Sequence, residues 1–288
     1  MKQDWETLIP LLVHIQANLD QDLALAGLAR KAGLSPFHLQ RLFKAAIGET
    51  PKAYTSRLRV ERAAFRLLIH ESSVLDIALE CGFQNHETFI RAFHRRFGKS
   101  PRDYRKWAQG EVSSRIERVD EGLPAQGFEI SATKVIRLRP MHLAFRRHVG
   151  PYESVPETIF DELEEWAIKG RHLPGPPVWI GIGHDAPMTT PPEKLRFDAA
   201  LVVPGPFAPE GRIGYQLLEG GDFAVTTHAG SYETLPAAYG AVFPRVMGLA
   251  GYQFVGVPVV EIYHTARVNV RYQLNHTDIC LPVVRVGV

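Results

Sequence analysis

A single carboxylate interrupts an apolar run near the end of the chain. Glu261 stands in the segment VPVVEIYH, and the alternation of a strand would place it on the same face as Val259 and Tyr263. A carboxylate held among aromatic rings away from water is costly unless a cation accompanies it. Glu261 therefore predicts a site that favours a cation as its partner. The alternative is a carboxylate on an edge strand, paired with Arg267 or Arg271.

Aromatic side chains elsewhere in the second half of the chain are candidates for the walls of this site. For each of them taken singly, ordinary core packing is at least as good an interpretation as ligand contact. The candidates are Trp179, Tyr263, Tyr152, Tyr232 and Trp166.

Two short segments in the first half carry side chains suited to reading DNA. An amide such as Gln40 matches an adenine edge, Arg41 matches a guanine edge or a phosphate, and Phe37 can contact a thymine methyl group. Lys44, Arg95 and Arg96 are better suited to phosphates, which position a protein without specifying sequence. The full candidate set is Phe37, His38, Gln40, Arg41 and Lys44 in the first segment, and Asn85, His86, Glu87, Arg91, Arg95 and Arg96 in the second.

Helices in a repeated pattern must present these side chains. A short apolar face at Leu28 and Ala29, a turn at Gly33 and a helix started by Ser35 and Pro36 form a helix-turn-helix pattern. A long helix is predicted over residues 51–69, and Pro10 is expected to delay or bend an opening helix. The pattern returns 49 to 50 residues later, where Cys81, Gly82, Phe93, Gly98 and Tyr104 match Ala32, Gly33, Phe43, Gly48 and Tyr54.

The repeated segments LARKAGLS, HLQRLFK, CGFQNHETFIRAF and FGKSPRDYR resemble the AraC/XylS-type DNA-binding domain over residues 5–108. That resemblance implies two recognition helices that enter adjacent major grooves of double-stranded DNA, about 34 Å apart. It also implies RNA polymerase as a partner, with activation commoner than repression. The alternative for this region is a small helical bundle with a solvated basic face.

The charge is distributed unevenly along the 288 residues. Residues 1–110 contain 17 Lys and Arg against 11 Asp and Glu, and residues 111–288 contain 16 against 20, so the total of +2 combines +6 with −4. Such a contrast predicts two domains with different partners, of which only the first suits a polyanion. No apolar stretch predicts a membrane span or a signal peptide, and Cys81 and Cys280 predict neither a disulfide nor a metal site. A cytoplasmic protein is expected.

The second half also contains a repeat, with an offset of 80 residues. The segment from His148 to Glu153 recurs from His228 to Glu233, and Glu261 corresponds to Gly181. Each copy reads as strand, helix and two strands, in the first copy over 134–148, 156–169, 178–184 and 196–203. Ser154 and Glu157 form a capping-box pattern at the first helix. Two such units side by side predict a pseudo-symmetric cleft between them.

The segments HVGPYESVPETIFDELEEWA, TPPEKLRFDAALVVPG, GGDFAVTTHAGSYE and VVEIYH resemble the GyrI-like effector-binding domain over residues 130–286. This resemblance implies a pocket in which a glutamate, here Glu261, and surrounding aromatic residues bind bulky amphipathic, often cationic, compounds. The order of the two regions is similar to that of Rob-type regulators. His148 and His228 share one context, which favours a structural role over a metal or acid–base role.

These observations predict a multidomain α and α+β protein. An all-α double helix-turn-helix domain (1–108) is followed by a linker (109–130) and a pseudo-symmetric βαββ repeat with a central ligand cleft (131–288). No HExxH, GxxxxGK[ST] or GxSxG motif occurs, so no cofactor, metal or catalytic residue is predicted.

The expected function is regulation of transcription, modulated by a small molecule bound in the second domain. The alternative from another class is a hydrolase, in which Glu261 acts with Tyr152 or Tyr232 in general acid–base catalysis. A DNA-organising protein with a vestigial pocket is a third hypothesis.

Overall fold

A computed structural model describes residues 2–108, 127–170, 172–173, 175–264 and 275–286. The chain divides into two compact units, each of which is considered by itself below. The first comprises Met1–Val112 with Ala208–Gly214, and the second comprises Ser113–Phe207 with Tyr215–Val288. None of the described helices is both long enough and apolar enough to span a membrane.

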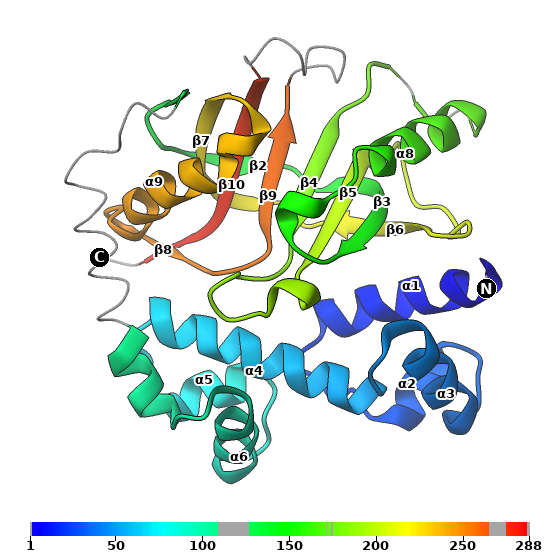
Figure 1. Cartoon of the computed structure of the whole chain (residues 1–288), viewed down its shortest axis with the longest axis vertical. Helices are drawn as coiled ribbons and strands as arrows, with labels where there is room; N and C mark the ends of the chain where they lie inside the picture. The colour runs from blue at the N-terminus through cyan, green and yellow to red at the C-terminus, as the bar shows by residue number, and fades with distance from the viewer. Residues whose placement is uncertain (1, 109–126, 171, 174, 265–274, 287–288) are drawn as a thin grey trace. The chain divides into compact units, whose positions relative to one another are not determined.

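The first unit is built from helices in the predicted order (Figure 1). The helices are α1 (Lys2–Ala17), α2 (Leu25–Lys31), α3 (Pro36–Ile47), α4 (Pro51–Ile69), α5 (Val74–Glu80), α6 (His86–Phe97) and a last helix over residues 101–108. The predicted long helix agrees with α4 at both ends. Pro10 lies inside α1 and does not delay its start. Ser35 begins α3, because its hydroxyl accepts a hydrogen bond from the backbone N–H of His38 at 3.2 Å.

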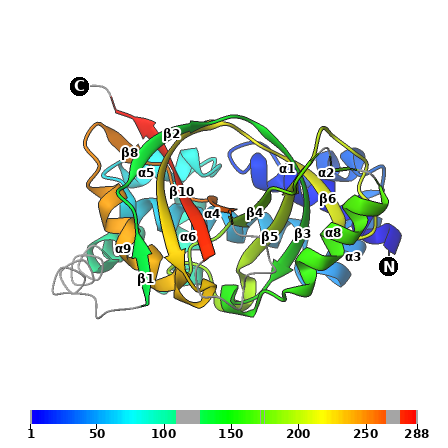
Figure 2. The same ribbon diagram turned by 90° about the horizontal axis from the view of Figure 1, so that it is seen from above.

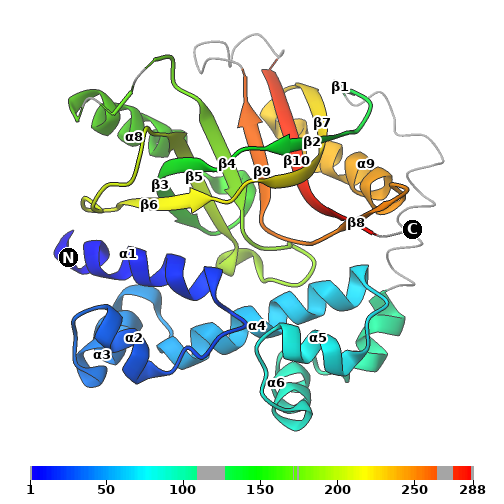
Figure 3. The same cartoon turned by 180° about the vertical axis from the view of Figure 1, so that it is seen from behind.

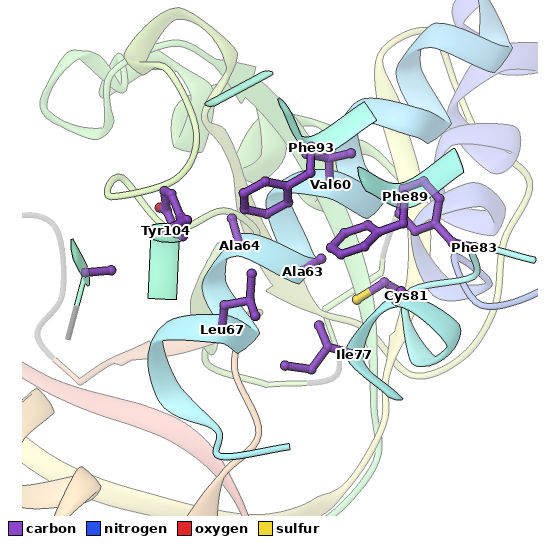
Figure 4. Packing of buried hydrophobic residues seen from close by; sticks show 12 residues of the cluster. Val60, Ala63, Ala64, Leu67, Ile77, Cys81, Phe83, Phe89, Phe93 and Tyr104 are labelled. Atoms are coloured by element: carbon purple, nitrogen blue, oxygen red, sulfur yellow. The ribbon is translucent and has the colours of Figure 1, made fainter. Parts of the chain in front are cut away.

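The two helix-turn-helix copies have separate cores joined by α4. Tyr54 and Leu58 of α4 pack into the first core, whereas Ala63, Ala64 and Leu67 pack into the second, which Figure 4 shows. The C-caps Gly48 and Gly98 both adopt left-handed backbone conformations, with φ of 82° and 67°. Only glycine adopts that conformation without strain, which is why it recurs at both helix ends. The repeat in the sequence is therefore a structural repeat.

The second unit is a ten-stranded sheet with two long helices. Its strands are β1 (Phe128–Ile130), β2 (Lys134–Leu138), β3 (Met141–Val149), β4 (Trp179–Gly183), β5 (Arg196–Val202), β6 (Ile213–Leu218), β7 (Gly221–Gly230), β8 (Tyr252–Phe254), β9 (Val259–Tyr263) and β10 (Asn275–Arg285). Its helices are α8 (Thr158–Lys169) and α9 (Leu235–Met247), with short 3₁₀ turns at Tyr152–Ser154, Pro192–Lys194 and Tyr232–Thr234.

The sheet brings the two βαββ copies together edge to edge. The strand order is β1-β7-β10-β9-β4-β5-β3-β6, with β2 beside β7 and β8 beside β10. The copies are thus β3-α8-β4-β5 and β7-α9-β9-β10, and they meet where β4 pairs with β9. Helix α8 packs on β3 and β5 and helix α9 packs on β7, with β4 and β9 between them (Figures 1 and 2). The predicted α and α+β class is confirmed.

Two local predictions are wrong. The single strand expected over 134–148 is two strands, because Pro140 cannot donate a ladder hydrogen bond and the chain leaves β2, beside β7, for β3, beside β5 (Figure 3). The Ser154 hydroxyl donates to the carbonyl of Pro151 instead of capping α8, which has no side-chain cap. In addition, the last residues of the predicted linker form β1, and residues 109–126 lie outside the described part of the chain.

Candidate DNA interface and ligand site

The outer face of α3 carries all five predicted side chains of the first segment. Phe37 is 79% exposed, an unusual state for a phenylalanine in a folded protein. Leu39 and Phe43 anchor the opposite face in the core. The exposed side chains of this helix include Phe37, His38, Gln40, Arg41 and Lys44.

The equivalent face of α6 is less uniform. His86, Glu87, Arg91 and Arg95 are exposed. Asn85 is exposed too, but its Oδ1 accepts a hydrogen bond from the backbone N–H of Thr88 at 2.9 Å and caps the helix. The cap leaves only the amide N–H₂ group of Asn85 available to a partner.

Two arginines of α4 hold parts of the helical unit together. Arg57 pairs with Glu49 and Glu61 at 3.1 and 3.0 Å. Arg59 donates to the backbone carbonyls of Leu19 and Gln21 at 2.7 and 2.6 Å. These contacts use part of the positive charge that composition alone would assign to DNA.

The carboxylate of Glu61 also reaches α6. Arg96, one of the candidates for phosphate contact, lies 3.5 Å from this buried carboxylate, and its guanidinium stacks over the ring of Phe97. A phosphate would therefore compete with Glu61 for Arg96. In contrast, Arg91 and Arg95 have no ion pair among the described residues.

The connecting helix has a length suited to two neighbouring grooves. α4 contains 19 residues and is about 28 Å long. Within this unit, α3 and α6 lie towards opposite ends of α4 (Figure 3). Successive major grooves on one face of DNA are about 34 Å apart, so one rigid helix of this length can space two recognition helices.

Glu261 lies in the centre of the sheet of the second unit. Its strand β9 pairs with β10 on one side and β4 on the other, so the alternative of an edge-strand carboxylate is wrong. The side chain is 9% exposed. Tyr239 of α9 donates a hydrogen bond to Oε1 at 2.9 Å, and Tyr263 donates one to Oε2. Arg267 and Arg271 lie outside the described residues.

Burial changes the protonation of this group. Loss of hydration raises the pKa of Glu261, and the hydrogen bonds from Tyr263 and Tyr239 only partly oppose that effect. No basic side chain among the described residues pairs with the carboxylate. Burial therefore disfavours the ionised carboxylate of the empty site, and a bound cation would oppose that effect.

Aromatic rings surround Glu261 on the same face of the sheet. The ring of Tyr232 lies 5.6 Å from that of Tyr263, and Phe160 of α8 lies 5.7 Å from Trp179 and 6.1 Å from Tyr263. Trp179 and Tyr263 are directly opposite each other across β4 and β9. Three of the predicted wall residues, Trp179, Tyr263 and Tyr232, are thus brought together with the carboxylate.

Gly181 leaves room for these side chains. It lies directly opposite Glu261 in the β4–β9 pair. A Cβ atom at this position would collide with the Tyr263 hydroxyl and would lie 2.8 Å from Cζ of Phe197. A larger residue here would therefore displace these side chains, whereas the corresponding position of the other copy carries the glutamate.

The other two predicted wall residues have different surroundings. The Tyr152 hydroxyl donates to the backbone carbonyl of Asp185 at 2.7 Å, and its ring lies 6.2 Å from that of Phe197. Trp166 stacks on His172 at 4.3 Å and lies 4.7 Å from Phe207, in a second aromatic group.

Two residues that were not predicted from the sequence contribute to the site. Tyr239 and Phe160 lie on α9 and α8, where their spacing is indistinguishable from that of core residues. In the repeat, Tyr239 corresponds to Ile159, and this change from an apolar residue to a tyrosine was the available signal.

In the helical unit, the repeat offset likewise points to Thr88 and His94, both exposed, as counterparts of His38 and Lys44.

The two repeated histidines make the same structural contact. Nε2 of His148 lies 3.2 Å from the Ser154 hydroxyl, and Nε2 of His228 lies 2.7 Å from the Thr234 hydroxyl. The equivalent contacts fix each ring against the turn that follows its strand.

The two cysteines lie in surroundings that disfavour a reactive thiolate. Both cysteines are buried and free. Burial raises the pKa of Cys81 to about 11 and that of Cys280 to about 12, which disfavours the reactive thiolate. No cluster of metal-ligating side chains occurs among the residues that the structure describes.

Comparison with known proteins agrees with this architecture. The family described as "GyrI-like small molecule binding domain" matches residues 132–284, and that described as "Helix-turn-helix domain" matches residues 28–106. Transcriptional regulator Rob of Salmonella typhimurium is 26% identical over 251 residues, covering 82% of this chain and 84% of that protein. Regulatory protein SoxS of Escherichia coli is 36% identical over 95 residues, covering 33% of this chain and 89% of that protein.

One solved structure aligns with most of the chain. "Cryo-EM structure of EcmrR-DNA complex in EcmrR-RPo" covers 91% of this chain and 99% of that chain, with a TM-score of 0.47 and 15% identity.

The fold and the two sites define a class, that of DNA-binding transcription regulators which carry a small-molecule binding domain. The chain belongs to the GyrI-like family, and it joins the GyrI-like domain to an AraC-type helix-turn-helix domain.

Proposed function

We propose that this regulator binds a cationic amphipathic molecule at Glu261 and reads two adjacent major grooves of DNA with α3 and α6. The observation that carries the ligand proposal is the state of the Glu261 carboxylate, which is 9% exposed. It accepts hydrogen bonds from two tyrosine hydroxyls, but it pairs with no cationic side chain among the described residues. An organic cation can supply the missing charge and pack against the rings of Trp179, Tyr232 and Tyr263. Hydrogen bonds from Tyr239 and Tyr263 would keep the carboxylate oriented towards it.

Calorimetry with a matched pair of probes tests the ligand site. We expect tetraphenylphosphonium to bind more tightly than triphenylphosphine oxide, which is bulky but uncharged. Glu261→Gln should abolish that preference, with a loss of about 2–5 kcal/mol of binding free energy for the cation, as for other buried charge pairs. Glu233→Gln, at an exposed glutamate of the same unit, is the control and should change nothing. Equal binding of the cation by Glu261→Gln and the unchanged chain would contradict the site.

The proposed DNA contacts predict a salt-dependent affinity. Several phosphate contacts should make log affinity fall linearly with log salt concentration. Arg41→Ala should weaken binding by about 1–3 kcal/mol and relax specificity at one base pair if Arg41 reads a base, or weaken all sequences evenly if it contacts phosphate. Lys169→Ala, on α8 of the other unit, is the control. A response that is flat with salt would contradict DNA binding.

The two recognition surfaces are proposed to differ in detail. We include Thr88 and His94 with the predicted residues of α6, because they are exposed counterparts of His38 and Lys44. Arg95 is a stronger candidate than Arg96 for phosphate contact, because Arg96 already has Glu61 as a partner. Arg95→Ala should therefore reduce the salt slope by about one unit, and Arg96→Ala should reduce it less.

The domains, the location and the mode of action of the regulator are also proposed. We take residues 1–108 as one domain and residues 131–288, extended by β1 (Phe128–Ile130), as the other. We also propose the cytoplasm as the location and activation through RNA polymerase as the mode of action. Transcription in vitro from a bound promoter, with and without ligand, tests the mode. A fall in transcript on adding the protein would show repression instead.

We assign no catalytic activity to the chain. The hydrolase hypothesis needs Tyr152 or Tyr232 beside Glu261, whereas the hydroxyls that hydrogen-bond to this carboxylate are those of Tyr239 and Tyr263. Mass spectrometry of a ligand after prolonged incubation with the protein tests the assignment. A product that disappears with Glu261→Gln would establish an enzyme.

A further inference from the structure

Three buried polar atoms lie close together at one end of β7 and β10 without a hydrogen-bond partner among the described residues. They are Nδ1 of His228, Oδ1 of Asn275 and Oγ1 of Thr277. His228 and Thr277 are 0% exposed and Asn275 is 2% exposed. A buried polar group without a partner loses its hydration and gains nothing in return, so three in one place require an explanation.

Strand register places these groups on the same face of the sheet as Glu261. His228 is directly opposite Thr277, and Thr277 is directly opposite Tyr263. Asn275 and Glu261 lie two residues before Thr277 and Tyr263 on their own strands, so they share that face. Figure 1 shows β7, β10 and β9 in succession across this half of the sheet. The three polar groups therefore extend the face that carries the carboxylate.

The hydrogen bonds around His228 determine what its free nitrogen can do. The Thr234 hydroxyl donates to the carbonyl of Ser231 at 2.6 Å. Its single proton is thus used, and it accepts the proton on Nε2 of His228 at 2.7 Å. Nδ1 is then the unprotonated nitrogen and an acceptor, and burial lowers the pKa of this histidine, which favours the neutral ring. With Oδ1 of Asn275 and the Thr277 hydroxyl, it forms a set dominated by acceptors.

The other βαββ copy shows that the fold does not need polar residues here. Leu195 and Phe197 occupy the positions that correspond to Asn275 and Thr277, and both are buried. In that copy, Phe197 packs towards Tyr152 at 6.2 Å between ring centroids. Replacing a leucine and a phenylalanine with an asparagine and a threonine removes apolar volume and adds polar atoms. Neither change stabilises an empty core.

We propose that His228, Asn275 and Thr277 form a second subsite that accepts hydrogen bonds from a hydroxyl or amino group of the ligand. This inference rests on the proposed function, because the cationic centre of the same ligand would lie at Glu261. Thr277 is a diagonal neighbour of Glu261 across β9 and β10, and such residues are about 7–8 Å apart. The ligand class is accordingly an amphipathic cation with a hydrogen-bond donor at the end of a short arm.

A series of triphenylphosphonium ions tests the subsite by calorimetry on the full chain. Each ion carries an alkyl arm of roughly two to six carbons, a span set by the separation of diagonal neighbours, and ends in a hydroxyl, a methyl ether or a methyl group. We expect the hydroxyl compound to bind roughly three- to tenfold more tightly than the methyl compound at one optimal arm length, since a net hydrogen bond has this value. The ether, which only accepts, should show no such gain. Equal affinities at every length would overturn the subsite.

Two substitutions link the preference to these residues. Thr277→Val removes the hydroxyl at constant shape, and Asn275→Leu copies the residue of the other repeat. Both should abolish the hydroxyl preference while the methyl compound binds as before. Without ligand, both should leave the melting temperature unchanged or raise it, because an unpartnered buried polar group is removed. A lower melting temperature for Thr277→Val would show that the hydroxyl has a partner inside the protein, and would overturn the proposal.

A pair of uncharged ligands distinguishes failure of the subsite from failure of the proposed cation site. 4-Phenyl-1-butanol and butylbenzene differ by the same hydroxyl and carry no charge. A preference for the alcohol that Thr277→Val removes supports the subsite even if Glu261→Gln leaves cation binding unchanged, in which case only the cation site is wrong. No preference for the hydroxyl in either series contradicts the subsite, whatever the role of Glu261.

Discussion

The two βαββ copies of the second unit have the same skeleton but opposite distributions of polar side chains. On the face of the sheet away from Glu261, each copy has an aspartate bonded to a histidine fourteen residues earlier. Asp198 and His184 are 2.6 Å apart, and Asp278 and His264 are 2.8 Å apart. The first aspartate is 0% exposed, whereas 21% of the Asp278 side chain is exposed.

The partners of the two aspartates account for this contrast. Both carboxylate oxygens of Asp198 accept hydrogen bonds from Arg147 at 2.7 Å, and Gln216 donates another at 2.9 Å. In the second copy, Thr227 takes the place of Arg147 and donates one hydrogen bond to Asp278 at 2.6 Å. The first copy therefore contains a saturated, buried ion cluster, and the second contains a smaller, partly hydrated one.

On the face of the sheet that carries Glu261, the second copy has the more polar side chains. The first copy presents Gly181, Leu195 and Phe197, and the second presents Glu261, Asn275 and Thr277 at the same positions. The larger buried ion cluster thus lies in the first copy. The polar atoms on this face that have no hydrogen-bond partner among the described residues lie in the second copy. We propose from this contrast that the first copy contributes mainly structural support and apolar walls, and that the second contributes the polar contacts to the proposed ligand.

Removing the central aspartate of the first copy should have the largest effect. Asp198→Asn removes the buried carboxylate charge to which Arg147 and His184 are bonded, and we expect the free energy of unfolding to fall by about 3–5 kcal/mol. Asp278→Asn should cost less than about 1 kcal/mol, because that pair is partly hydrated. Urea titration followed by tryptophan fluorescence measures both. Equal losses would contradict the proposed division of roles between the two copies.

The pH dependence of stability tests the same carboxylate. Burial alone would raise the pKa of Asp198, but Arg147 and His184 outweigh it and hold the pKa well below its ordinary value. The stabilisation is therefore fully present above about pH 4, the value of an unfolded aspartate, and is lost as the pH falls through the folded pKa. Between about pH 4 and pH 2, the unchanged chain should lose stability more steeply than Asp198→Asn.

A methyl group at the boundary between the copies should have an intermediate effect. Gly181→Ala forces the Tyr263 hydroxyl and the ring of Phe197 to move, and we expect it to cost about 1–3 kcal/mol and to weaken cation binding. Gly221→Ala, also in a strand but with nothing near its Cβ position, is the control. Thermal unfolding and calorimetry measure the two effects. Unchanged cation affinity in Gly181→Ala would show that Tyr263 does not position Glu261.

The repeated histidine contacts offer a smaller comparison. Thr234→Val leaves Nε2–H of the fully buried His228 without an acceptor, and should cost about 1–2 kcal/mol. Ser154→Ala removes the longer contact to the half-buried His148 and should cost less than about 0.5 kcal/mol. Chemical unfolding of the two variants side by side decides whether burial sets the difference.

The smallest expected change is a gain in stability. Because burial raises the pKa of Glu261, ionisation of this group opposes folding as the pH rises above about 4.5, its ordinary value. Glu261→Gln should therefore be as stable as the unchanged chain in acid and up to about 1 kcal/mol more stable at neutral pH. Cation affinity of the unchanged chain should rise over the same pH range. A destabilised Glu261→Gln at neutral pH would show that the ionised carboxylate has a structural role.

Much of the fold was predictable because the determining signals are local. Ser35 and Pro36 start α3, Gly48 ends it, and the spacing of Leu39 and Phe43 defines its buried face. The offset of 50 residues then extends this pattern to α6, and the offset of 80 identifies the βαββ copies. The exception was the break between β2 and β3 at Pro140, where a single strand was predicted. No local signal showed that β2 and β3 pair with strands of different copies.

The candidate site was only partly predictable. A lone charge in an apolar strand is enough to identify Glu261 from the sequence. Tyr239 is separated from Glu261 by 22 residues and has the spacing of a core residue in α9, although it donates a hydrogen bond to the carboxylate. Trp166 matched the other aromatic candidates in residue type, but it stacks on His172 in a different group. Pairing across elements depends on packing, which residue type and spacing do not encode.

The sequence by itself determined the element types, the two internal repeats, the family resemblances and the position of the carboxylate that we propose as the centre of a ligand site. Each of these depends on neighbouring residues or on similarity between segments. Only the tertiary structure decided which buried polar groups have partners and which, such as Nδ1 of His228 and the Thr277 hydroxyl, have none among the described residues. The reason is physical: hydrogen bonding and desolvation depend on which atoms meet across strands and helices, and those contacts exist only in the folded chain.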